Sequence, residues 1–240
     1  MIKEKKSVRV AVAQFRAIRG NIDRNSSEHL KLIKSASEKD VDIIVFPELS
    51  LTGYEPDMSN SLKVSSATVQ NMNFNKVSEK FDITIVVGAP VDDGHGLPKL
   101  GAIIFSPGKE PILASKINLH SHELDYFSPG KSKHTFTIKG VVFGLAICAD
   151  ALNESHISSL RESGVDCCLA PSLITENGYD NDVEILRNYA DKYRFSIAVS
   201  NYIGKSGVFF STGKSMIINQ KHQIQSQASI NEVGFIWSDI

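Results

Sequence analysis

The chain has few cysteines, little net charge and no long apolar run. Its 240 residues contain three cysteines, Cys148, Cys167 and Cys168, of which the last two are adjacent. A small, odd number of cysteines argues against a disulfide framework and indicates a reducing compartment. We therefore expect a cytoplasmic protein in which Cys167 and Cys168 are core strand residues.

The charge is balanced, with 26 Lys and Arg against 27 Asp and Glu and a formal net charge of -1. This balance gives no general attraction to nucleic acid or to anionic lipid. No apolar segment approaches the roughly 20 residues of a membrane-spanning helix, and the Lys-rich N-terminus leads directly into a strand-like segment, unlike a secretory signal. We expect a small-molecule partner, with no nucleic acid and no membrane.

The chain lacks Pro/Gly/Ser-rich linkers and charge-dense linkers, and its length suffices for one substantial core, so we predict a single domain over residues 1–240. Hydrophobic patterning predicts strands that alternate with helices, with hairpin-like pairs inserted. This order indicates an α/β or α+β sandwich. The expected strands are 8–13, 41–46, 83–88, 102–106, 111–117, 135–138, 141–147, 165–170 and 197–200, and the expected helices are 23–39, 153–163 and 181–193, with loop and helix between 55 and 80 and a strand-rich tail.

Three polar or reactive side chains each follow an apolar strand. Glu48 comes after the strand ending at Phe46, Lys116 comes at the end of the 111–117 segment, and Cys148 follows Ile147. The carboxyl ends of strands in α/β sheets converge on one rim, where ligands bind. We therefore expect these three side chains to share one cleft.

Together the three side chains contain what thiol acyl chemistry requires. A thiol attacks as thiolate, so its pKa must fall through a cation, a base or a helix N-terminus. Lys116 is a cation, Glu48 is a base, and the helix expected after Cys148 is a third source of stabilisation. Each residue alone has a simpler structural interpretation: Cys148 as a core residue, Glu48 as a cap after Pro47, and Lys116 as a solvated strand-end lysine.

Local motifs favour the catalytic interpretation. The segments are Phe46–Tyr54 (FPELSLTGY), Lys116–Leu119 (KINL) and Gly144–Asp150 (GLAICAD). They resemble, in order, the three signatures of the nitrilase superfamily of carbon–nitrogen hydrolases: F-P-E followed by T-G-Y, K-x-H-L, and G-x-x-I-C-x-D. A further segment, Glu123–Gly130 (ELDYFSPG), resembles the stretch that carries the second glutamate of this family.

The resemblance implies an α-β-β-α sandwich, usually a homodimer or higher oligomer assembled through helices, and a mechanism without metal or organic cofactor. Glu48 would deprotonate Cys148, and the thiolate would attack the carbon of a small amide, N-carbamoyl compound or nitrile. Lys116 and the backbone N–H of Ala149 would hold the oxyanion, and Glu123 would position the hydrolytic water. The same resemblance makes Tyr54, Ser172 and Leu173 the candidate substrate-binding residues.

The sequence also departs from the family pattern. Ala149 stands where relatives commonly have an aromatic residue, Asn118 stands in the position of the motif histidine, and Ala151–Glu154 replaces an R-x-P-E stretch. These changes bear on the substrate more than on the reaction, because the glutamate, lysine and cysteine are all present. Ala149 predicts a pocket wall smaller than usual.

Three alternatives remain open. In a Cys–His enzyme, His120 or His122 would be the base, although this pair with Glu123 is a poor metal motif. A catalytically silent binding protein would retain the fold without the reaction. A glutamine-using amidase would supply ammonia to a separate synthetase. A weaker hypothesis places three acidic residues at the pocket mouth, where they would favour a cationic substrate: Glu176, Asp180 and Asp182.

Overall fold

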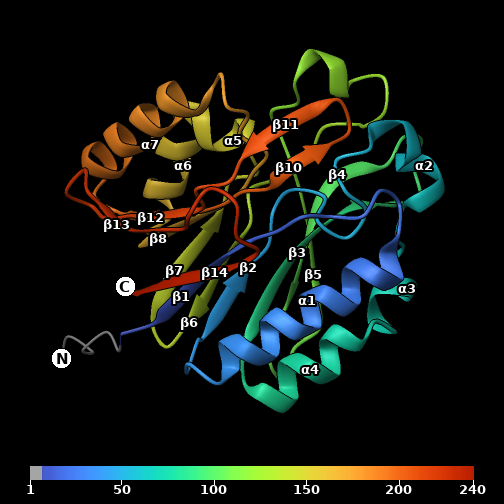
Figure 1. Cartoon of the computed structure of the whole chain (residues 1–240), viewed down its shortest axis with the longest axis horizontal. Coiled ribbons are helices and arrows are strands. Elements are labelled where there is room, and N and C mark those ends of the chain that lie inside the picture. The colour runs from blue at the N-terminus through green and yellow to red at the C-terminus, as the bar shows by residue number, and fades with distance from the viewer. Residues whose placement is uncertain (1–6) are drawn as a thin grey trace.

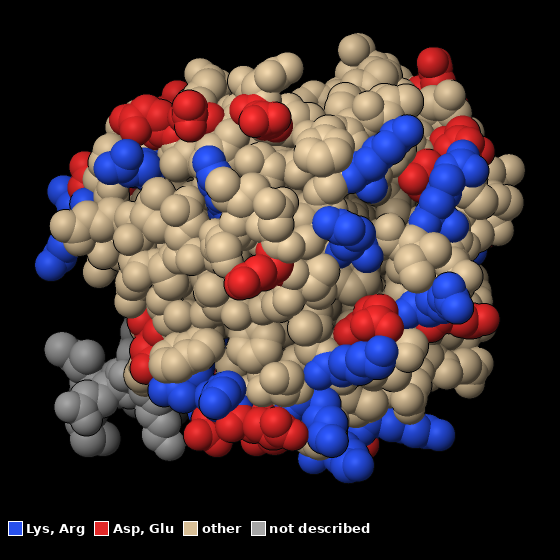
Figure 2. Space-filling view, in the orientation of Figure 1, with Lys and Arg blue, Asp and Glu red and all other residues tan. Residues whose placement is uncertain are grey.

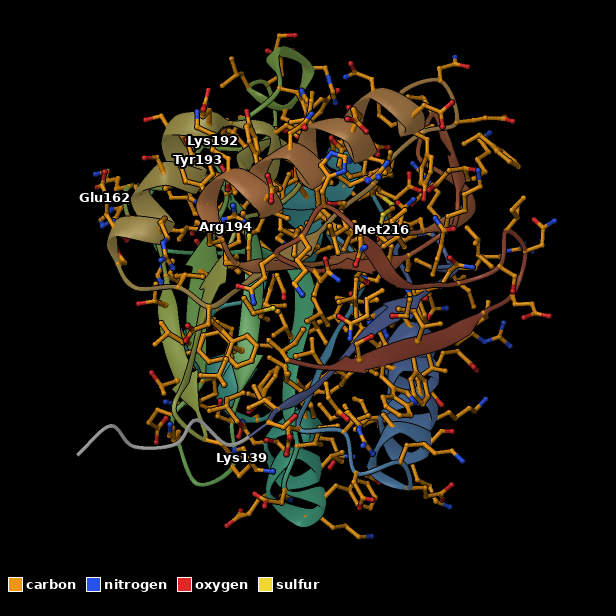
Figure 3. All side chains as sticks on the ribbon, turned by 90° about the vertical axis from the view of Figure 1, so that its left-hand side faces the viewer. Lys139, Glu162, Lys192, Tyr193, Arg194 and Met216 are labelled. Atoms are coloured by element: carbon orange, nitrogen blue, oxygen red, sulfur yellow. The ribbon has the colours of Figure 1, made fainter. Side chains whose placement is uncertain are left out.

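Two six-stranded sheets stack face to face between two layers of helices in the computed structural model, which describes residues 7–240 (Figure 1). Most of the Lys-rich start lies outside the described residues. The view turned by 90° shows α7 on one side of the strands and the first helices of the chain on the other (Figure 3). The predicted four-layer α-β-β-α sandwich is confirmed.

The first sheet has the strand order β14-β1-β2-β3-β4-β5. β1, β2 and β3 are parallel, and β4 and β5 return as an antiparallel meander, so β5 again runs in the direction of β3. The strands are β1 (Arg9–Gln14), β2 (Ile43–Val45), β3 (Thr84–Val91), β4 (Lys99–Phe105), β5 (Ile112–Ser115) and β14 (Gly234–Asp239), and the helical elements on this half are α1 (Ile22–Ser37), η1 (Pro56–Met58), α2 (Ser59–Leu62), α3 (Ser66–Gln70) and α4 (Asn73–Phe81).

The second sheet repeats this plan in the order β13-β12-β9-β8-β7-β6, with β7, β8 and β9 parallel. Its strands are β6 (Thr135–Ile138), β7 (Val141–Leu145), β8 (Cys167–Pro171), β9 (Ser196–Ser200), β12 (Met216–Ile218) and β13 (Ile224–Gln227), and its helices are α5 (Ala149–Leu152), α6 (Glu154–Glu162) and α7 (Tyr179–Tyr193). A separate hairpin is formed by β10 (Ile203–Ser206) and β11 (Phe209–Thr212), and a single 3-10 turn, η2 (Ser121–Glu123), follows β5.

Alternation along the strands explains the two cores. Successive side chains of a strand point to opposite faces. In β8, Cys167 packs in the core between the two sheets, whereas Cys168 packs in the core between the second sheet and its helices. Both cysteines are fully buried, as expected from the sequence.

The two sheets meet along β1 and β9, and their carboxyl ends coincide there. The Ser200 hydroxyl donates a hydrogen bond of 2.6 Å to the carbonyl of Ala13. Beyond the strand ends, Phe15 and Tyr202 form a parallel bridge. The rims of both sheets therefore form one edge of the molecule, and the segments that follow β2, β5 and β7 emerge on it.

Most expected elements are present, with differences at their boundaries. β2 spans only Ile43–Val45, because the backbone turns away from β3 after Phe46. The chain also forms the four-residue helix α5 directly after Cys148, where we expected no helix before Asn153. Among residues 7–240, no helix is long and apolar enough to cross a bilayer. Positive and negative side chains are interspersed on the face in Figure 2.

Candidate active site

Glu48 lies in a tight turn after β2 that crosses the neighbouring strand. A Cβ atom at Gly88 of β3 would lie 2.2 Å from the backbone nitrogen of Leu49 and 2.7 Å from the carbonyl oxygen of Pro47, so only glycine permits this crossing. The turn is further fixed from the second sheet, because the Tyr202 hydroxyl donates a 2.7 Å hydrogen bond to the carbonyl of Glu48. The carboxylate is therefore held on a rigid backbone.

Lys116 bridges two carboxylates in the interior. It follows β5, and its Nζ lies 2.8 Å from Oε1 of Glu48 and 2.8 Å from Oε1 of Glu123. All three side chains have an exposed fraction of 0%. An ammonium group has three N–H donors, so one donor remains for a third acceptor.

Hydrogen-bond donors contact both carboxylate oxygens of Glu123. Besides Lys116, the Tyr54 hydroxyl donates a 2.6 Å hydrogen bond to Oε1, and the backbone N–H of His120 donates a 2.7 Å bond to Oε2. In contrast, Oε2 of Glu48 has no hydrogen-bond partner among the described residues. Glu48 thus keeps one oxygen free to accept a proton, whereas both oxygens of Glu123 are engaged.

The two carboxyl groups consequently have opposite pKa shifts. Burial raises the pKa of Glu48 to about 7, and the attraction of Lys116 offsets this only in part because Glu123 repels the same charge. Burial also acts to raise the pKa of Glu123, but Lys116, Tyr54 and the N–H of His120 outweigh it and lower the pKa. Two carboxylates share one cation, so the one with more hydrogen-bond donors keeps its charge and the other one titrates.

The lysine remains charged in this interior. Burial disfavours its ammonium form, but the negative charges of Glu48 and Glu123 raise the pKa of Lys116 well above its ordinary value. A permanently charged ammonium beside a reacting centre stabilises developing negative charge.

Cys148 occupies a strained turn between β7 and α5. Its backbone has φ 50° and ψ −104°, a region that costs a non-glycine residue of the order of 1–3 kcal/mol. The turn is tied to the neighbouring strand by a 2.9 Å bond from the Cys148 N–H to the carbonyl of Pro171. Cys148 and Ala149 are half-buried, whereas Glu48, Lys116 and Glu123 are fully buried.

Ala149 begins α5, where backbone N–H groups of the first turn have no acceptor within the helix. Its N–H therefore remains available beside the sulfur, as the predicted oxyanion donor requires.

The thiol itself differs from the sequence-based expectation. We expected the pKa of Cys148 to be low, but burial and the negative charge of Glu48 raise it to about 12, despite the opposing effects of Lys116 and of the Leu173 N–H. The single-turn helix α5 that follows Cys148 does not bring the pKa of this thiol back down. The resting group is thus a neutral thiol, which needs a base during attack. Glu48 lies close enough for the thiol to influence its pKa.

The candidate substrate-binding residues lie in three different settings. Tyr54 contacts Glu123 and lines a cavity of about 360 Å³. Leu173 is half-buried, and its N–H interacts with Cys148. Ser172 is buried, and its hydroxyl donates to the carbonyl of Ala170, within its own segment. The other residues that line the cavity are Arg19, Glu55, Pro56, Asp57, His122, Tyr126, Gly207, Val208 and Phe209.

The two histidines lie near Glu123 and Tyr54. The rings of His120 and His122 stack with centroids 5.5 Å apart, and Nε2 of His122 lies 3.1 Å from the Tyr54 hydroxyl. Because Tyr54 donates its proton to Glu123, Nε2 of His122 is the donor in the second contact. Residues 7–240 contain no group of three or more His, Cys, Asp or Glu side chains suited to a metal ion.

Of the three acidic residues expected at the pocket mouth, one lies near the site. Asp182, in the first turn of α7, is half-buried and interacts electrostatically with His120. Burial raises the pKa of Asp182. Glu176 and Asp180 are exposed.

Sequence reasoning missed the residues that hold this cluster in place. The roles of Tyr202 and Gly88 depend on contacts between segments distant in sequence. Asp150, two residues after the cysteine, is 1% exposed and accepts backbone hydrogen bonds from the segment after Lys116. For Asp150, the one signal in the sequence was a carboxylate inside an otherwise apolar motif.

Comparison with known proteins places this geometry in a family. The chain is 27% identical over 232 residues to a glutamine-dependent NAD(+) synthetase of Acinetobacter baylyi, covering 93% of this chain and 42% of the relative. It is 26% identical over 231 residues to a nitrilase of Pyrococcus abyssi, covering 94% of this chain and 86% of the relative. The chain thus spans less than half the length of the synthetases it matches.

Solved structures share the fold. A mutant amidase from Nesterenkonia sp. AN1, with the acetamide moiety of fluoroacetamide added covalently at its active-site cysteine, superimposes with a TM-score of 0.89 at 19% identity, covering 100% of this chain and 93% of that one. A glutamine-dependent NAD+ synthetase from Acinetobacter baumannii gives 0.83 at 26% identity, covering 98% and 45%. The sequence model of the carbon–nitrogen hydrolases matches residues 9–240, so the chain belongs to the carbon–nitrogen hydrolase family.

Proposed function

We propose that this protein hydrolyses the non-peptide C–N bond of a small amide or N-carbamoyl compound through a thioester on Cys148. The observation that carries the proposal is the buried ion cluster: one lysine bridges two glutamates whose pKa values are shifted in opposite directions. Burying three charged side chains is costly, and such groups with divergent pKa values are typical of acid–base sites.

In the first half-reaction, Glu48 takes the thiol proton on its free Oε2 as the sulfur attacks the carbonyl carbon. The oxyanion is held by the third N–H of Lys116 and by the backbone N–H of Ala149. Collapse of the tetrahedral intermediate breaks the C–N bond, and Glu48 returns the proton to the departing ammonia or amine. A thioester on Cys148 remains.

In the second half-reaction, Glu48 removes a proton from water, and the hydroxide attacks the thioester carbon. Glu123, which accepts hydrogen bonds from Tyr54 and Lys116, helps to position this water and holds the Lys116 ammonium while the second oxyanion forms. The C–S bond breaks, the sulfur recovers its proton from Glu48, and the carboxylic or carbamic acid leaves. No step in this scheme requires a metal ion or an organic cofactor.

The cavity beside Tyr54 is the candidate location for the side group of the substrate: Glu48, Lys116 and Cys148 do not line it, but Tyr54 does and contacts Glu123. Its volume of about 360 Å³ is at the lower end for ligand pockets, and its apolar lining includes Val208 and Phe209. The charged groups on its wall are already paired with each other, since Arg19 binds both Glu55 and Asp57.

Mass spectrometry of the intact protein during turnover tests the proposal. Incubation with a panel of aliphatic amides, glutamine and other ω-amides, and N-carbamoyl amines should give an adduct on Cys148 whose mass equals the acyl group of one panel member. Cys148→Ala, with its sulfur absent, should give no adduct. Turnover of a panel member by Cys148→Ala at the wild-type rate would contradict the thioester mechanism.

A glutamine amidase that supplies ammonia to a partner is the second candidate. It is favoured by the matches to glutamine-dependent NAD(+) synthetases, of which this chain covers 42%. Asp182 beside His120 is suited to the amino group of such a substrate. Faster ammonia release from glutamine than from simple amides, lost selectively in Asp182→Asn, would support this candidate over the first. If the enzyme preferred anionic over cationic panel members, Asp182 would not be a binding residue for the amino group of the substrate.

A catalytically silent binding protein is the third candidate, and thiol labelling tests it. Cys148 is half-buried, whereas Cys167 and Cys168 are fully buried, and burial raises the pKa of all three thiols. In an active enzyme, iodoacetamide should label Cys148 first, and Glu48→Gln should slow that labelling. Equal, slow labelling of all three cysteines would favour the silent protein.

A further inference from the structure

Asp150 links the two halves of the candidate active site. Lys116 is carried by the first sheet and Cys148 by the second, so their separation depends on contacts between the segments that follow β5 and β7. Asp150 lies two residues after Cys148, and its side chain is directed to the backbone just after Lys116. It is 1% exposed.

The carboxylate receives four hydrogen bonds from two residues. The N–H of Ile117 lies 3.2 Å from both carboxylate oxygens, and the backbone N–H and the side-chain amide of Asn118 each lie 2.7 Å from Oδ1. Three of these contacts come from the backbone, so they fix the path of the chain rather than a side chain. A carboxylate, with only acceptors, matches this set of donors fully.

A pair of asparagines completes the link. The Asn153 side-chain amide donates a 3.2 Å bond to Oδ1 of Asn118, and Oδ1 of Asn153 accepts the N–H of His156 at the start of α6. Asn118 is thereby oriented so that its own N–H₂ points to Asp150. The segment after Lys116 is tied to both ends of α5.

The link also acts on the strained cysteine. The backbone N–H of Asp150 donates to the carbonyl of Ile147, so the residues on both sides of Cys148 are bonded to each other across the turn. A residue at φ 50° persists only where its surroundings define the backbone. The backbone N–H groups of Asp150 and Ala151 and the carbonyl of Pro171 all take part in hydrogen bonds that hold this turn.

We propose that Asp150, with Asn118 and Asn153, is a positioning residue that sets the Cys148 sulfur against the Lys116 ammonium and the Glu48 carboxylate. This inference rests on the proposed thioester function for its kinetic readout. It assigns a role to two of the positions at which the sequence departs from the family pattern, Asn118 and Asn153, which are joined by one hydrogen bond. Asp150 itself touches no reacting atom.

Asp150→Asn is the sharpest test, because it preserves shape while placing an N–H₂ group opposite the Ile117 N–H or the Asn118 donors. Asp166→Asn is the matched control: Asp166 accepts the N–H of Val142 at 2.9 Å, at the opposite end of β7. We expect Asp150→Asn to lower kcat at least thirtyfold with KM changed less than threefold, and Asp166→Asn to leave both within threefold. Equal kinetic losses in the two variants would overturn the proposal.

A second readout is independent of turnover. In the wild type, iodoacetamide labelling of Cys148 should follow ionisation of Glu48, and in Asp150→Asn the labelling should follow an ordinary thiol titration at higher pH. An unchanged labelling profile in a folded Asp150→Asn protein would overturn the proposal. If the wild type forms no acyl adduct but the labelling profiles still differ, the thioester function fails while the positioning role stands.

The asparagine pair provides a coupling test. Asn118→Ala and Asn153→Ala should each lower kcat about tenfold, and the double variant should lose no more than the larger single loss. Multiplicative losses would show that the two amides act separately and would remove them from the proposal. Asn153 also caps α6, so its variant requires a check of helix content by circular dichroism.

Discussion

Two lysines of this protein form glutamate pairs of similar geometry in opposite environments. Lys116 lies 2.8 Å from each of two glutamates with all side chains at 0% exposure, whereas Lys192 pairs with Glu154 at exposures of 61% and 51%. Figure 3 shows Lys192 and Tyr193 at the end of α7, on the outside of the molecule. Both lysines donate to a glutamate, but water surrounds only the second pair.

The two environments shift the pKa of the paired glutamate in opposite directions. The hydrogen bonds from Lys192 and Tyr193 lower the pKa of Glu154, as expected for an exposed ion pair. Burial raises the pKa of Glu48 although Lys116 contacts it. A lysine contact therefore does not decide whether a glutamate can act as a base near neutral pH. Desolvation and the second carboxylate decide it.

Replacing each lysine should give the largest contrast. Lys116→Met removes the oxyanion donor and leaves two buried carboxylates uncompensated, so we expect turnover to fall at least ~10³-fold and stability to fall by about 3 kcal/mol. Lys192→Met should change neither measurably. Steady-state kinetics and urea unfolding measure both effects. Equal changes in turnover and stability in the two variants would show that the environments of the two lysines do not distinguish their roles.

Replacing each glutamate should give the next largest effect. Glu48→Gln preserves shape but removes the base, and general base catalysis contributes roughly 10²–10⁴-fold, so turnover should fall by that factor. Glu154→Gln should retain wild-type turnover. The histidine alternative predicts the reverse pattern: loss in His120→Ala or His122→Ala with Glu48→Gln active.

A third contrast concerns buried and exposed histidines. Burial lowers the pKa of His29 from 6.5 to about 3, and Nε2 of His29 contacts the Ser50 hydroxyl. Since the unfolded state binds the extra proton first, stability should be full above pH 6.5 and fall progressively toward pH 3. We expect a loss of about 2 kcal/mol at pH 5 from this residue alone.

Urea unfolding at several pH values measures this loss. In His29→Gln the slope between pH 5 and 6.5 should diminish. The control is His95→Gln, which replaces an exposed histidine. Identical slopes in all three proteins would show that His29 is not a source of the acid sensitivity.

The pH dependence of turnover should give the smallest of these effects. With a raised Glu48 pKa of about 7, the base is ionised above that pH and protonated below it. The rate constant kcat/KM should therefore fall about tenfold per pH unit on the acid side. Glu154→Gln should keep the same profile. A midpoint near the ordinary glutamate value would show that burial does not tune this group.

Much of the fold and of the site could be predicted from the chain alone. Apolar runs with β-branched residues marked most strands, and three motifs marked Glu48, Lys116 and Cys148. The direction of the Cys148 pKa shift was wrong, because it depends on how many atoms displace water around the sulfur. The short helix α5 was missed because four residues carry no periodic signal.

The links between segments were also beyond sequence reasoning. The sequence shows Asp150 only as part of a motif. Its partners lie 32 and 33 positions away, and three of its four contacts are with backbone N–H groups. In the sequence, Gly88 is an ordinary strand residue. Only the turn that carries Glu48, which crosses the strand at this point, explains why glycine is required there. A residue that contributes only a backbone group can be of almost any type, so the sequence does not reveal such a contact.

The sequence by itself determined which side chains are present, that their strands end together, and that two carboxylates accompany a single lysine. Only the tertiary structure decided which carboxylate stays charged and which one exchanges protons. That decision depends on the number of donors around each oxygen and on the exclusion of water, and both quantities arise when distant segments pack.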